Sequence, residues 1–556
     1  MKIRIKKDLT KVQKVTEKKI VDYLLENRDI KDKHEFTHPQ PPTDIDLIRI
    51  RRVFKSRLEK VFRTLEKIKK EGRLIVVYTD YDADGITGGA ILWETLYILG
   101  FKVMPYVPDR KSEGYGFSVK GIDKVKKLYN PALIISVDHG ITAHEKIIYA
   151  KSLGIDVVVT DHHLRSETAP KQALAVFHIP ELSGAGVSYF FAKDIFDYFV
   201  KKTPQAAIYK NYFTSDYLAF AAIGGIADLI PLTGINRSLV KFGLAALNTT
   251  GRIGLVHILK EAGIYGKKIT PYEVGFVIAP RINAVGRLEK AIDALRLLCT
   301  KKEDRAYQLA EHIGKKNQLR QDLVKQAFDQ AKKIVDGYGK IPKIIILYPP
   351  PSQVWDEGII GLIAAKITET YYRPTLVLTP IDGYYKGSGR SIASFHITDF
   401  LRDLNLLKEV GGHRQAVGFT LEESIFDRFV KKINQRADKT LTEKDLEKTI
   451  EADFKIDPNM ITLDLVKEME KLQPFGIGNP TPSFYSKVTV NGAEIFGKNN
   501  NHLKIWAGQL ELIAFGEADR YLELSRGKQI GAVYNVEIDR WAGKEKLRGK
   551  ISHWTT

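Results

Sequence analysis

Cysteine is almost absent from this chain of 556 residues, and the single one is Cys299 in the apolar run ALRLLCT. A lone cysteine excludes an internal disulfide framework and suits a reducing compartment. Long apolar runs are absent too, since none reaches the roughly 18 residues of a membrane helix. The basic N-terminus MKIRIKKDLTKVQKV lacks the apolar core of a secretory signal. We therefore predict a cytoplasmic protein with no membrane partner.

Positive charge is in clear excess, with 86 Lys and Arg residues against 67 Asp and Glu residues and a net charge of +19. Such a balance favours a polyanionic partner, nucleic acid above all. A lysine-rich proteome would produce the same excess, so charge alone leaves the partner open. The length of the chain predicts several domains, because it exceeds what one compact core supports.

Three short apolar segments are rich in β-branched residues and lead into aspartates. They are RLIVVYT at 73–79, PALIISVD at 131–138 and IDVVVTD at 155–161. A helix-like segment follows each of them, and this alternation predicts a parallel α/β sheet. Ligands of such sheets bind beyond the carboxyl ends of the strands. We therefore expect the three aspartates to converge on one edge of the sheet.

The rest of the chain predicts further domains. The apolar positions of 303–337 have the spacing of a long amphipathic helix. A second α/β unit begins at KIIILY (343–348), and short strands with Gly and Asn turns after residue 450 predict a small β-barrel. The expected organisation is an N-terminal arm and helix (1–60), an α/β domain (61–300), a connector helix (301–340), a smaller α/β domain (341–445) and a β-barrel (446–556).

Four clusters of metal-type ligands lie in the first α/β domain. Their mixture of carboxylates and imidazoles suits Mn²⁺ or Mg²⁺. Two such ions can activate water and neutralise phosphate charge. A calcium loop is excluded because it needs a glutamate at its twelfth position, which counted from Asp80 is Ile91. Turn or capping roles remain the alternative for single aspartates. The clusters are DYDADG (80–85), SVDHG (136–140), TDHH (160–163) and GIAD (225–228).

These clusters resemble the signature motifs of the DHH superfamily of phosphoesterases. The resemblance implies hydrolysis with two divalent metal ions, Mn²⁺ or Mg²⁺. It implies a catalytic His163 beside the scissile phosphate and an Asp138 that bridges the ions. Some members carry a ligand histidine at the position of Tyr78 here. The implied metal ligands are Asp82, Asp84, Asp138, His162 and Asp228, with Asp80 as an additional candidate.

Two glycine-rich stretches resemble the substrate motifs of the DHH-associated domain. They are GSGRS at 387–391 and the segment from GGH at 411–413 to Gly418. Glycines let backbone N–H groups approach a phosphate, and an arginine can clamp it. We therefore expect Ser388, Arg390 and His413 to bind substrate. The alternatives are a simple turn for GSGRS and a helix cap with a core histidine for GGH.

Further segments resemble the RecJ exonucleases, a family within this superfamily. They are VPDRKSEGYGFS (107–118), LSGAGVSY (182–189), APRINAVGRLE (279–289), WDEGIIG (355–361) and PFGIGNPTPSF (474–484). The resemblance implies a parallel-sheet DHH catalytic domain, a connector helix, a DHH-associated domain and an oligonucleotide-binding (OB) barrel. Asp356 replaces the family's usual histidine. The implied substrate-binding residues of the first domain are Arg110, Tyr115, Arg281, Asn283 and Arg287.

The function implied by the resemblance is a single-stranded-DNA exonuclease in DNA repair and recombination, which releases 5′-mononucleotides in the 5′→3′ direction. Arg110, Ser388 and Arg390 are the candidates for binding the 5′-phosphate, and a helicase and a single-strand-binding protein are possible partners. One alternative is a DHH phosphodiesterase that acts on RNA or short oligonucleotides, or with 3′→5′ polarity. The other is a binding protein that keeps the fold but has lost its metal motifs.

Overall fold

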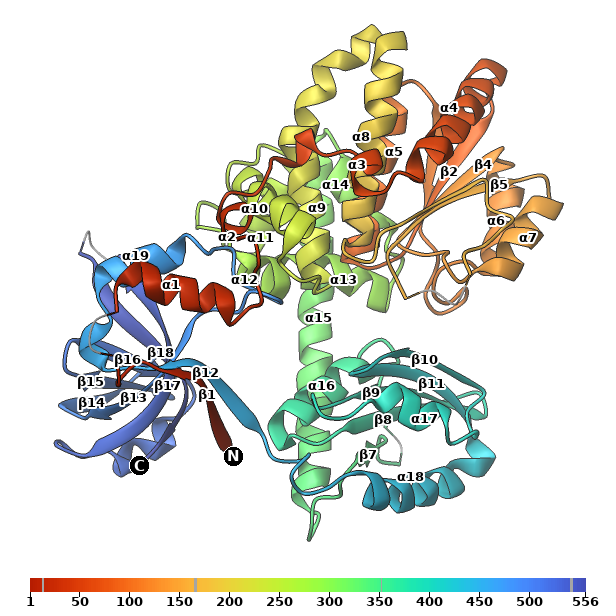
Figure 1. Cartoon of the computed structure of the whole chain (residues 1–556). Coiled ribbons are helices and arrows are strands. Elements are labelled where there is room, and N and C mark those ends of the chain that lie inside the picture. The colour runs from red at the N-terminus through yellow and green to blue at the C-terminus, as the bar shows by residue number, and fades with distance from the viewer. Residues whose placement is uncertain (13–14, 165–167, 352, 541–543) are drawn as a thin grey trace. The chain divides into compact units, whose positions relative to one another are not determined.

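The computed structural model describes every residue except 13–14, 165–167, 352 and 541–543 (Figure 1). The chain divides into two compact units. The long helix expected over 303–337 is confirmed as α15 (Glu303–Asp336), which contributes residues to both units. No helix within the described residues is both long and apolar enough to cross a membrane. Unit 1 consists of Met1–Ile3 and Lys315–Ile450, and unit 2 of Arg4–Gly314 and Glu451–Thr556.

A five-stranded parallel sheet of order β3-β2-β4-β5-β6 lies at the centre of the α/β part of unit 2. Helices α4, α5 and α8 pack on one face and α6 and α7 on the other. The strands are buried on both faces, which explains their continuous apolar runs. The elements are β2 (Leu74–Thr79), α5 (Ala83–Ile98), β3 (Lys102–Tyr106), α6 (Val119–Tyr129), β4 (Leu133–Val137), α7 (His144–Ser152), β5 (Asp156–Asp161) and β6 (Ala175–His178).

A helical layer completes this part of the unit. Helices α8 and α9 pack on α5, and α10 packs on α9. Near its end the layer contains a short π-helical segment, Val274–Ile278, directly before α13. The helices are α8 (Gly184–Phe199), α9 (Asp216–Ala227), α10 (Gly234–Asn248), α11 (Ile253–Glu261), α12 (Pro271–Glu273), α13 (Ala279–Leu288) and α14 (Ile292–Cys299).

The first sixty residues do not form a single arm but divide between two cores. Strand β1 (Lys2–Asp8) lies next to β12, and α1 (Glu17–Glu26) packs on α19. Helix α4 (Phe54–Glu71) instead packs against the parallel sheet. Both helices are amphipathic, so each needs its own apolar partner. The short helices between them are α2 (Lys33–Thr37) and α3 (Leu47–Ile50).

The C-terminal part of unit 2 is an eight-stranded sheet of order β1-β12-β13-β17-β18-β16-β15-β14. Its core contains the fully buried Trp554 and the apolar face of α1. This agrees with the barrel expected from the short strands. Its elements are β12 (Thr449–Lys455), α19 (Leu463–Glu470), β13 (Ser483–Thr489), β14 (Gly492–Phe496), β15 (His502–Ala507), β16 (Leu510–Ala514), β17 (Gln529–Asp539) and β18 (Lys546–Thr555).

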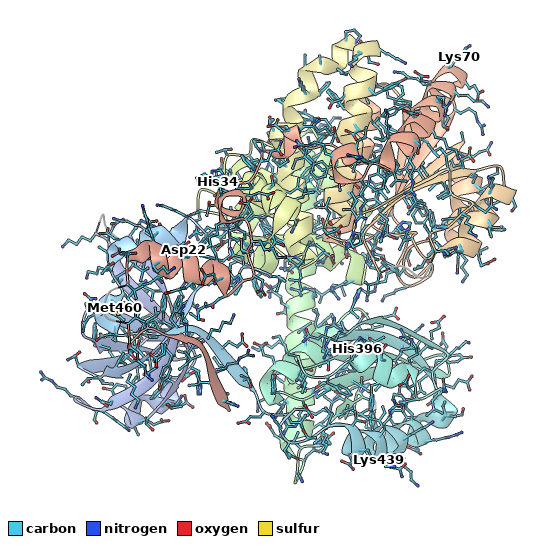
Figure 2. All side chains as sticks on the ribbon, in the orientation of Figure 1. Asp22, His34, Lys70, His396, Lys439 and Met460 are labelled. Carbon is cyan, nitrogen blue, oxygen red and sulfur yellow. The ribbon has the colours of Figure 1, made fainter. Side chains whose placement is uncertain are left out.

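Unit 1 contains the second α/β sheet, of order β10-β11-β9-β8-β7. The GGH segment lies in strand β10, where His413 is exposed, so neither a helix cap nor a core histidine describes it. Figure 2 shows the side chains of both units. The elements are β7 (Ile345–Leu347), α16 (Ile360–Tyr371), β8 (Thr375–Ile381), β9 (Tyr384–Arg390), α17 (Ile397–Arg402), β10 (Glu409–His413), β11 (Ala416–Glu422) and α18 (Phe426–Thr440).

A half-buried carboxyl on α8 should make the stability of unit 2 depend on pH. Asp194 accepts a hydrogen bond from the N–H of Leu47, and burial raises its pKa to about 7 from an ordinary value of 3.8. Between these two values the folded state binds more protons than the unfolded state, so stability falls as pH rises through this window. Asp194→Asn keeps the acceptor and removes the buried charge.

We expect Asp194→Asn to raise the free energy of unfolding by about 1–2 kcal/mol near pH 8, after allowance for solvent screening. The gain should vanish below about pH 4, where the carboxyl is neutral in both states. Urea unfolding at the two pH values measures the difference. An equal gain at both would contradict the assignment.

Candidate active site

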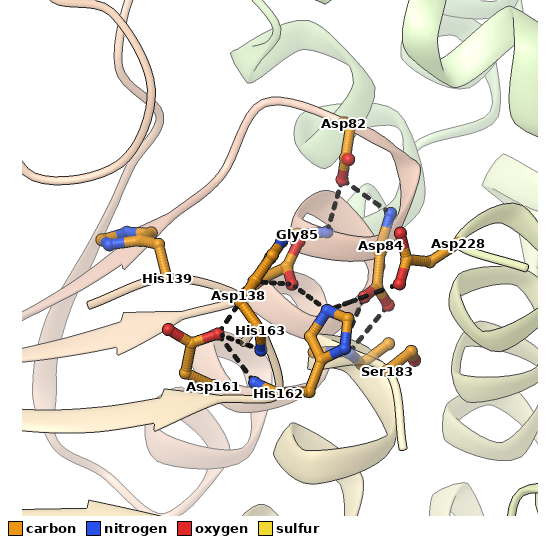
Figure 3. Close-up of polar contacts among 12 residues, drawn as sticks. Asp82, Asp84, Gly85, Asp138, His139, Asp161, His162, His163, Ser183 and Asp228 are labelled. Atoms are coloured by element: carbon orange, nitrogen blue, oxygen red, sulfur yellow. Dashed lines mark hydrogen bonds and ion pairs between the residues drawn. The ribbon is translucent and has the colours of Figure 1, made fainter. Parts of the chain in front are cut away.

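The side chains expected as metal ligands meet at the carboxyl edge of the parallel sheet (Figure 3). They form three groups, and within each the ligand atoms lie within 4.8 Å of one another. Asp138 belongs to two of these groups and His162 to two, so the groups are continuous. The groups are Asp80–Asp82–Asp138, Asp84–His162–Asp228 and Asp138–His162–His163.

The first acidic cluster forms the loop between β2 and α5. Asp82 is the N-cap of α5, and its Oδ1 accepts the N–H groups of Asp84 and Gly85, both at 3.0 Å. The second carboxylate oxygen of Asp82, Oδ2, makes neither of these bonds and can face a metal ion. A Cβ at Gly85 would lie 2.7 Å from the carbonyl oxygen of Asp80, so only glycine allows the loop to turn this tightly. The turn therefore accounts for Asp82 and Gly85 of the motif Asp-x-Asp-x-Asp-Gly, in addition to any role of its carboxylates as metal ligands.

The carboxylate of Asp84 is held by the N-terminus of α8. The N–H groups of Gly184 and Ala185 donate to its two oxygens at 2.6 and 2.9 Å, where the helix dipole also favours negative charge. Gly184 approaches so closely that a Cβ there would lie 2.4 Å from the Cβ of Asp138. Sequence reasoning had assigned no role to these residues, although the segment SGAG carried the signal.

Asp138 follows β4 in a left-handed backbone conformation, with φ of +69°. Non-glycine residues rarely adopt this region, and such strain often occurs at functional sites. Its N–H donates to the carbonyl of Thr160 at 3.0 Å, which anchors it to β5. The strained turn directs the carboxylate toward His162, whose Nε2 lies 3.0 Å from Oδ1 of Asp138.

The two histidines after β5 have opposite electrostatic surroundings. Burial lowers the pKa of His162 to about 4, so its neutral ring can donate a lone pair to a metal. Burial also opposes the charge on His163, but the hydrogen bond to Asp161 and the nearby carboxylates raise its pKa to about 9. Asp161 Oδ1 accepts from Nδ1 of His163 at 2.9 Å, and Tyr115 Oη lies 3.1 Å from Nε2. His163 is therefore oriented on both sides, and the Asp161 carboxylate favours its protonated form.

The remaining atoms of the site fit hard divalent cations. Asp80 Oδ1, Asp138 Oδ1 and His162 Nε2 are buried, and apart from the 3.0 Å approach of the last two to each other, no described residue offers them a hydrogen bond. Burial and the neighbouring carboxylates raise the pKa values of Asp80 and Asp138 well above the usual range. A buried cluster of this kind is unfavourable unless cations neutralise it. Oxygen donors with one imidazole match Mn²⁺ or Mg²⁺.

Of the expected substrate residues in unit 2, two lie beside the acidic loop. The guanidinium of Arg110 lies over the Tyr81 ring at 5.4 Å, and Tyr115 is half exposed while its hydroxyl contacts His163. Asn283 Oδ1 accepts the N–H of Ala83 at 2.7 Å and so supports the start of α5, while its expected role in substrate binding stays a prediction. Arg281 forms an ion pair with Glu261 at 2.6 Å.

Arg287 lies on the same helix as Asn283, and its positive charge acts to lower the pKa of the Tyr81 hydroxyl. Tyr78, at the position of the histidine found in some superfamily members, is buried with its ring against Tyr106 and Phe117. It therefore belongs to the core of the sheet and not to the ligand groups, which include Asp80 instead.

Two expected residues of unit 1 converge within that unit. Arg390 Nη1 lies 3.4 Å from Ser388 Oγ on strand β9. Both side chains lie beside Gly361 in the first turn of α16, where a Cβ would come within 2.9 Å of Ser388 Oγ. The side chains and the N-terminus of a twelve-residue helix together make a setting suited to a phosphate. His413, on β10, differs from this pair because its side chain is exposed.

Comparison with known protein families identifies three domains along the chain. Residues 74–224 match the N-terminal domain of the DHH family, residues 342–439 the DHHA1 domain, and residues 452–553 the RecJ OB domain. Curated relatives are named single-stranded-DNA-specific exonuclease RecJ. The one from Bacillus subtilis is 33% identical over 86% of this chain, which spans 62% of that relative. The one from Haemophilus influenzae is 30% identical over 88% of this chain and 89% of its own length.

Solved structures agree with these relatives. RecJ from Thermus thermophilus, in complex with Mn²⁺, matches 100% of this chain and 79% of its own with a TM-score of 0.81 and 27% identity. An exonuclease RecJ bound to manganese is 33% identical over 70% of this chain and 97% of its own, with a TM-score of 0.57. The expected fold class is thereby confirmed.

Proposed function

This chain belongs to the RecJ family of DHH-type exonucleases, and from that premise we propose that it hydrolyses single-stranded DNA from the 5′ end and releases 5′-mononucleotides. The observation that carries the proposal is the convergence of five aspartates and His162 at one sheet edge, with buried ligand atoms that lack hydrogen bonds. A binding protein without activity has no need of such a cluster, because unneutralised buried carboxylates destabilise a fold.

The residues of the site fall into metal ligands and a catalytic histidine. Asp80, Asp82, Asp84, Asp138, His162 and Asp228 would hold two Mn²⁺ or Mg²⁺ ions, and Asp138, which belongs to two of the ligand groups, would contribute to both. When bound, these ions lower the pKa of water and offset charge on the phosphate. His163, held by Asp161 and Tyr115, carries the positive charge that can stabilise the phosphate or protonate the leaving 3′-oxygen.

End recognition is assigned to residues that suit a terminal phosphate. Ser388 and Arg390 with the N-terminus of α16 are the candidates of unit 1 for binding the 5′-phosphate, and Arg110 is the candidate of unit 2. Tyr115 is half exposed and can contact the terminal nucleotide. The OB domain holds the strand beyond the site and favours a polymer over a small dinucleotide. Arg281, Asn283, Arg287 and His413 remain candidate strand contacts.

The cellular setting follows from the substrate. A single strand arises when a helicase opens a duplex, and it is covered by single-strand-binding protein. We therefore propose that both act with this enzyme in cytoplasmic DNA repair and recombination. The alternative function, a phosphodiesterase for RNA or short oligonucleotides or with 3′→5′ polarity, uses the same metal chemistry and differs only in strand selection.

Digestion of end-labelled strands separates these functions. We expect 5′-labelled single-stranded DNA to yield labelled mononucleotide at once in Mn²⁺ or Mg²⁺, while a 3′ label stays on shortening fragments. Duplex DNA with blunt ends and RNA of the same sequence serve as controls. Early release of the 3′ label, or faster cleavage of RNA, would support the alternative instead.

A further inference from the structure

The loop at residues 474–480, with the sequence PFGIGNP, lies in the C-terminal part of unit 2 but contacts the segment that follows Asp228. The N–H of Leu232 donates to the carbonyl of Ile477 at 2.7 Å. A Cβ at Gly478, whose φ is +75°, would lie 3.0 Å from the Cβ of Pro231, and one at Gly476 would lie 2.8 Å from Leu232. The loop and residues 231–232 are therefore packed backbone against backbone.

Hydrogen bonds within the loop 474–480 and at its ends hold it in place. Gly476 and Asn479 exchange two backbone hydrogen bonds, at 2.8 and 3.1 Å. The fully buried Asn479 side chain donates to the carbonyls of Leu472 and Pro474 and accepts from Arg28 Nε at 3.1 Å. These contacts fix both ends of the loop, so its position is set by the fold of the C-terminal part and the N-terminal helix α1 region.

Asp228, by contrast, has little local support for its carboxylate. It ends α9 as the C-cap residue, and the next residue, Leu229, is left-handed with φ of +59°. The helix dipole disfavours a negative charge at this end. Within the described part of the chain, the carboxylate has His162 as its polar contact, Oδ2 to Nε2 at 3.4 Å. Asp84 differs, since two N–H groups hold it. The N–H of Asp228 donates to the carbonyl of Gly224 at 2.9 Å, and the direction of its carboxylate depends also on the left-handed turn that follows it.

We propose that the loop 474–480 is a positioning element of the metal centre: it holds residues 229–233 and thereby keeps the Asp228 carboxylate in ligating position. The inference rests on the proposed function, because it takes Asp228 as a ligand. Ile477 and Gly478 touch neither substrate nor metal and act through the Asp228 segment.

Manganese binding to the full-length, DNA-free protein tests the inference without relying on turnover. Gly478→Ala pushes on Pro231, while Gly516→Ala is the matched control, since Gly516 has the same φ of +75° and an added Cβ there would meet no described heavy atom within 4 Å. Both variants carry the same backbone strain. Electron paramagnetic resonance of Mn²⁺ counts the sites and their affinities. Asp228→Asn is the reference for loss of the ligand itself.

We expect Gly478→Ala to bind one of two Mn²⁺ ions about tenfold more weakly, as is typical when the support of a ligand is lost. It should also lose the spectrum of a coupled pair at limiting Mn²⁺, as Asp228→Asn does, and Gly516→Ala should match the wild type. Excess Mn²⁺ should restore the hydrolysis rate of Gly478→Ala. If that variant does not fold, Gly476→Ala, which meets only the end of the Leu232 side chain, replaces it.

Two results would overturn the inference. One is wild-type Mn²⁺ affinity in Gly478→Ala, and the other is equal weakening of both ions in Gly478→Ala and Gly516→Ala, which would indicate general destabilisation. In either case the wild-type protein still binds two ions and digests DNA, so the proposed function stands. A wild-type protein that binds no Mn²⁺ would overturn the proposed function together with the inference.

Discussion

Replacing Asp138 by alanine is expected to abolish hydrolysis while leaving strand binding largely intact. Asp138 belongs to two of the three ligand groups, so its loss disturbs both cation positions at once. Because metal ions supply several kcal/mol of transition-state stabilisation, we expect the hydrolysis rate to fall on the order of 10³-fold or more. Gel-based digestion and fluorescence anisotropy with a labelled strand measure the two properties separately.

Two further variants make this result specific. Asp138→Asn keeps a residue that tolerates the left-handed backbone, and it should be as inactive as the alanine variant if charge and not strain is responsible. Asp156→Ala removes a carboxylate from the opposite end of the same sheet, at the start of β5, and should retain full activity. Activity that survived in both Asp138 variants would show that the bridging assignment is wrong.

Among the substitutions considered, Arg237→Met should cause the largest fall in the free energy of unfolding. Its guanidinium is fully buried, lies 3.8 Å from the Phe36 ring and donates to the carbonyls of Phe36, Leu472 and Gln473 at 2.6–2.9 Å. Burial lowers its pKa to about 10, so it remains charged at neutral pH. Removing it leaves the carbonyls of Phe36 and Gln473 without their donor, while the Leu472 carbonyl keeps only the Asn479 side chain, and the loss should cost about 3–5 kcal/mol.

Urea unfolding of Arg237→Met measures this cost from the shift in the midpoint. Lys241 offers the control, since it lies one turn further along α10 and donates a single hydrogen bond to the carbonyl of Thr37. Lys241→Met should cost only about 1 kcal/mol. Equal effects of the two substitutions would contradict the view that Arg237 ties the N-terminal and C-terminal segments to α10.

Local patterns predicted much of the fold and the site because they depend on neighbours in the chain. The β-rich runs before Asp80 and Asp138, and the run that ends in Asp161, are the strands β2, β4 and β5. In a parallel sheet such residues must share an edge. The long helix over 303–337 was equally visible, because its apolar spacing repeats over many turns.

Long-range contacts could not be predicted in this way. The first sixty residues divide between two cores because α1 and α4 each cover an apolar face that distant parts of the chain form. The support of α5 by Asn283 joins residues that lie 200 positions apart. No periodicity in the sequence encodes such a pair.

The sequence by itself determined which candidate metal ligands this protein carries, in what order, and that three of their four clusters follow strands, because strand propensity and residue chemistry are local. Only the tertiary structure decided how those ligands are held. The N-terminus of α8 fixes Asp84 across 100 residues, and the loop 474–480 lies against the segment after Asp228. Such contacts arise when helices and loops pack, and packing is decided by the whole chain.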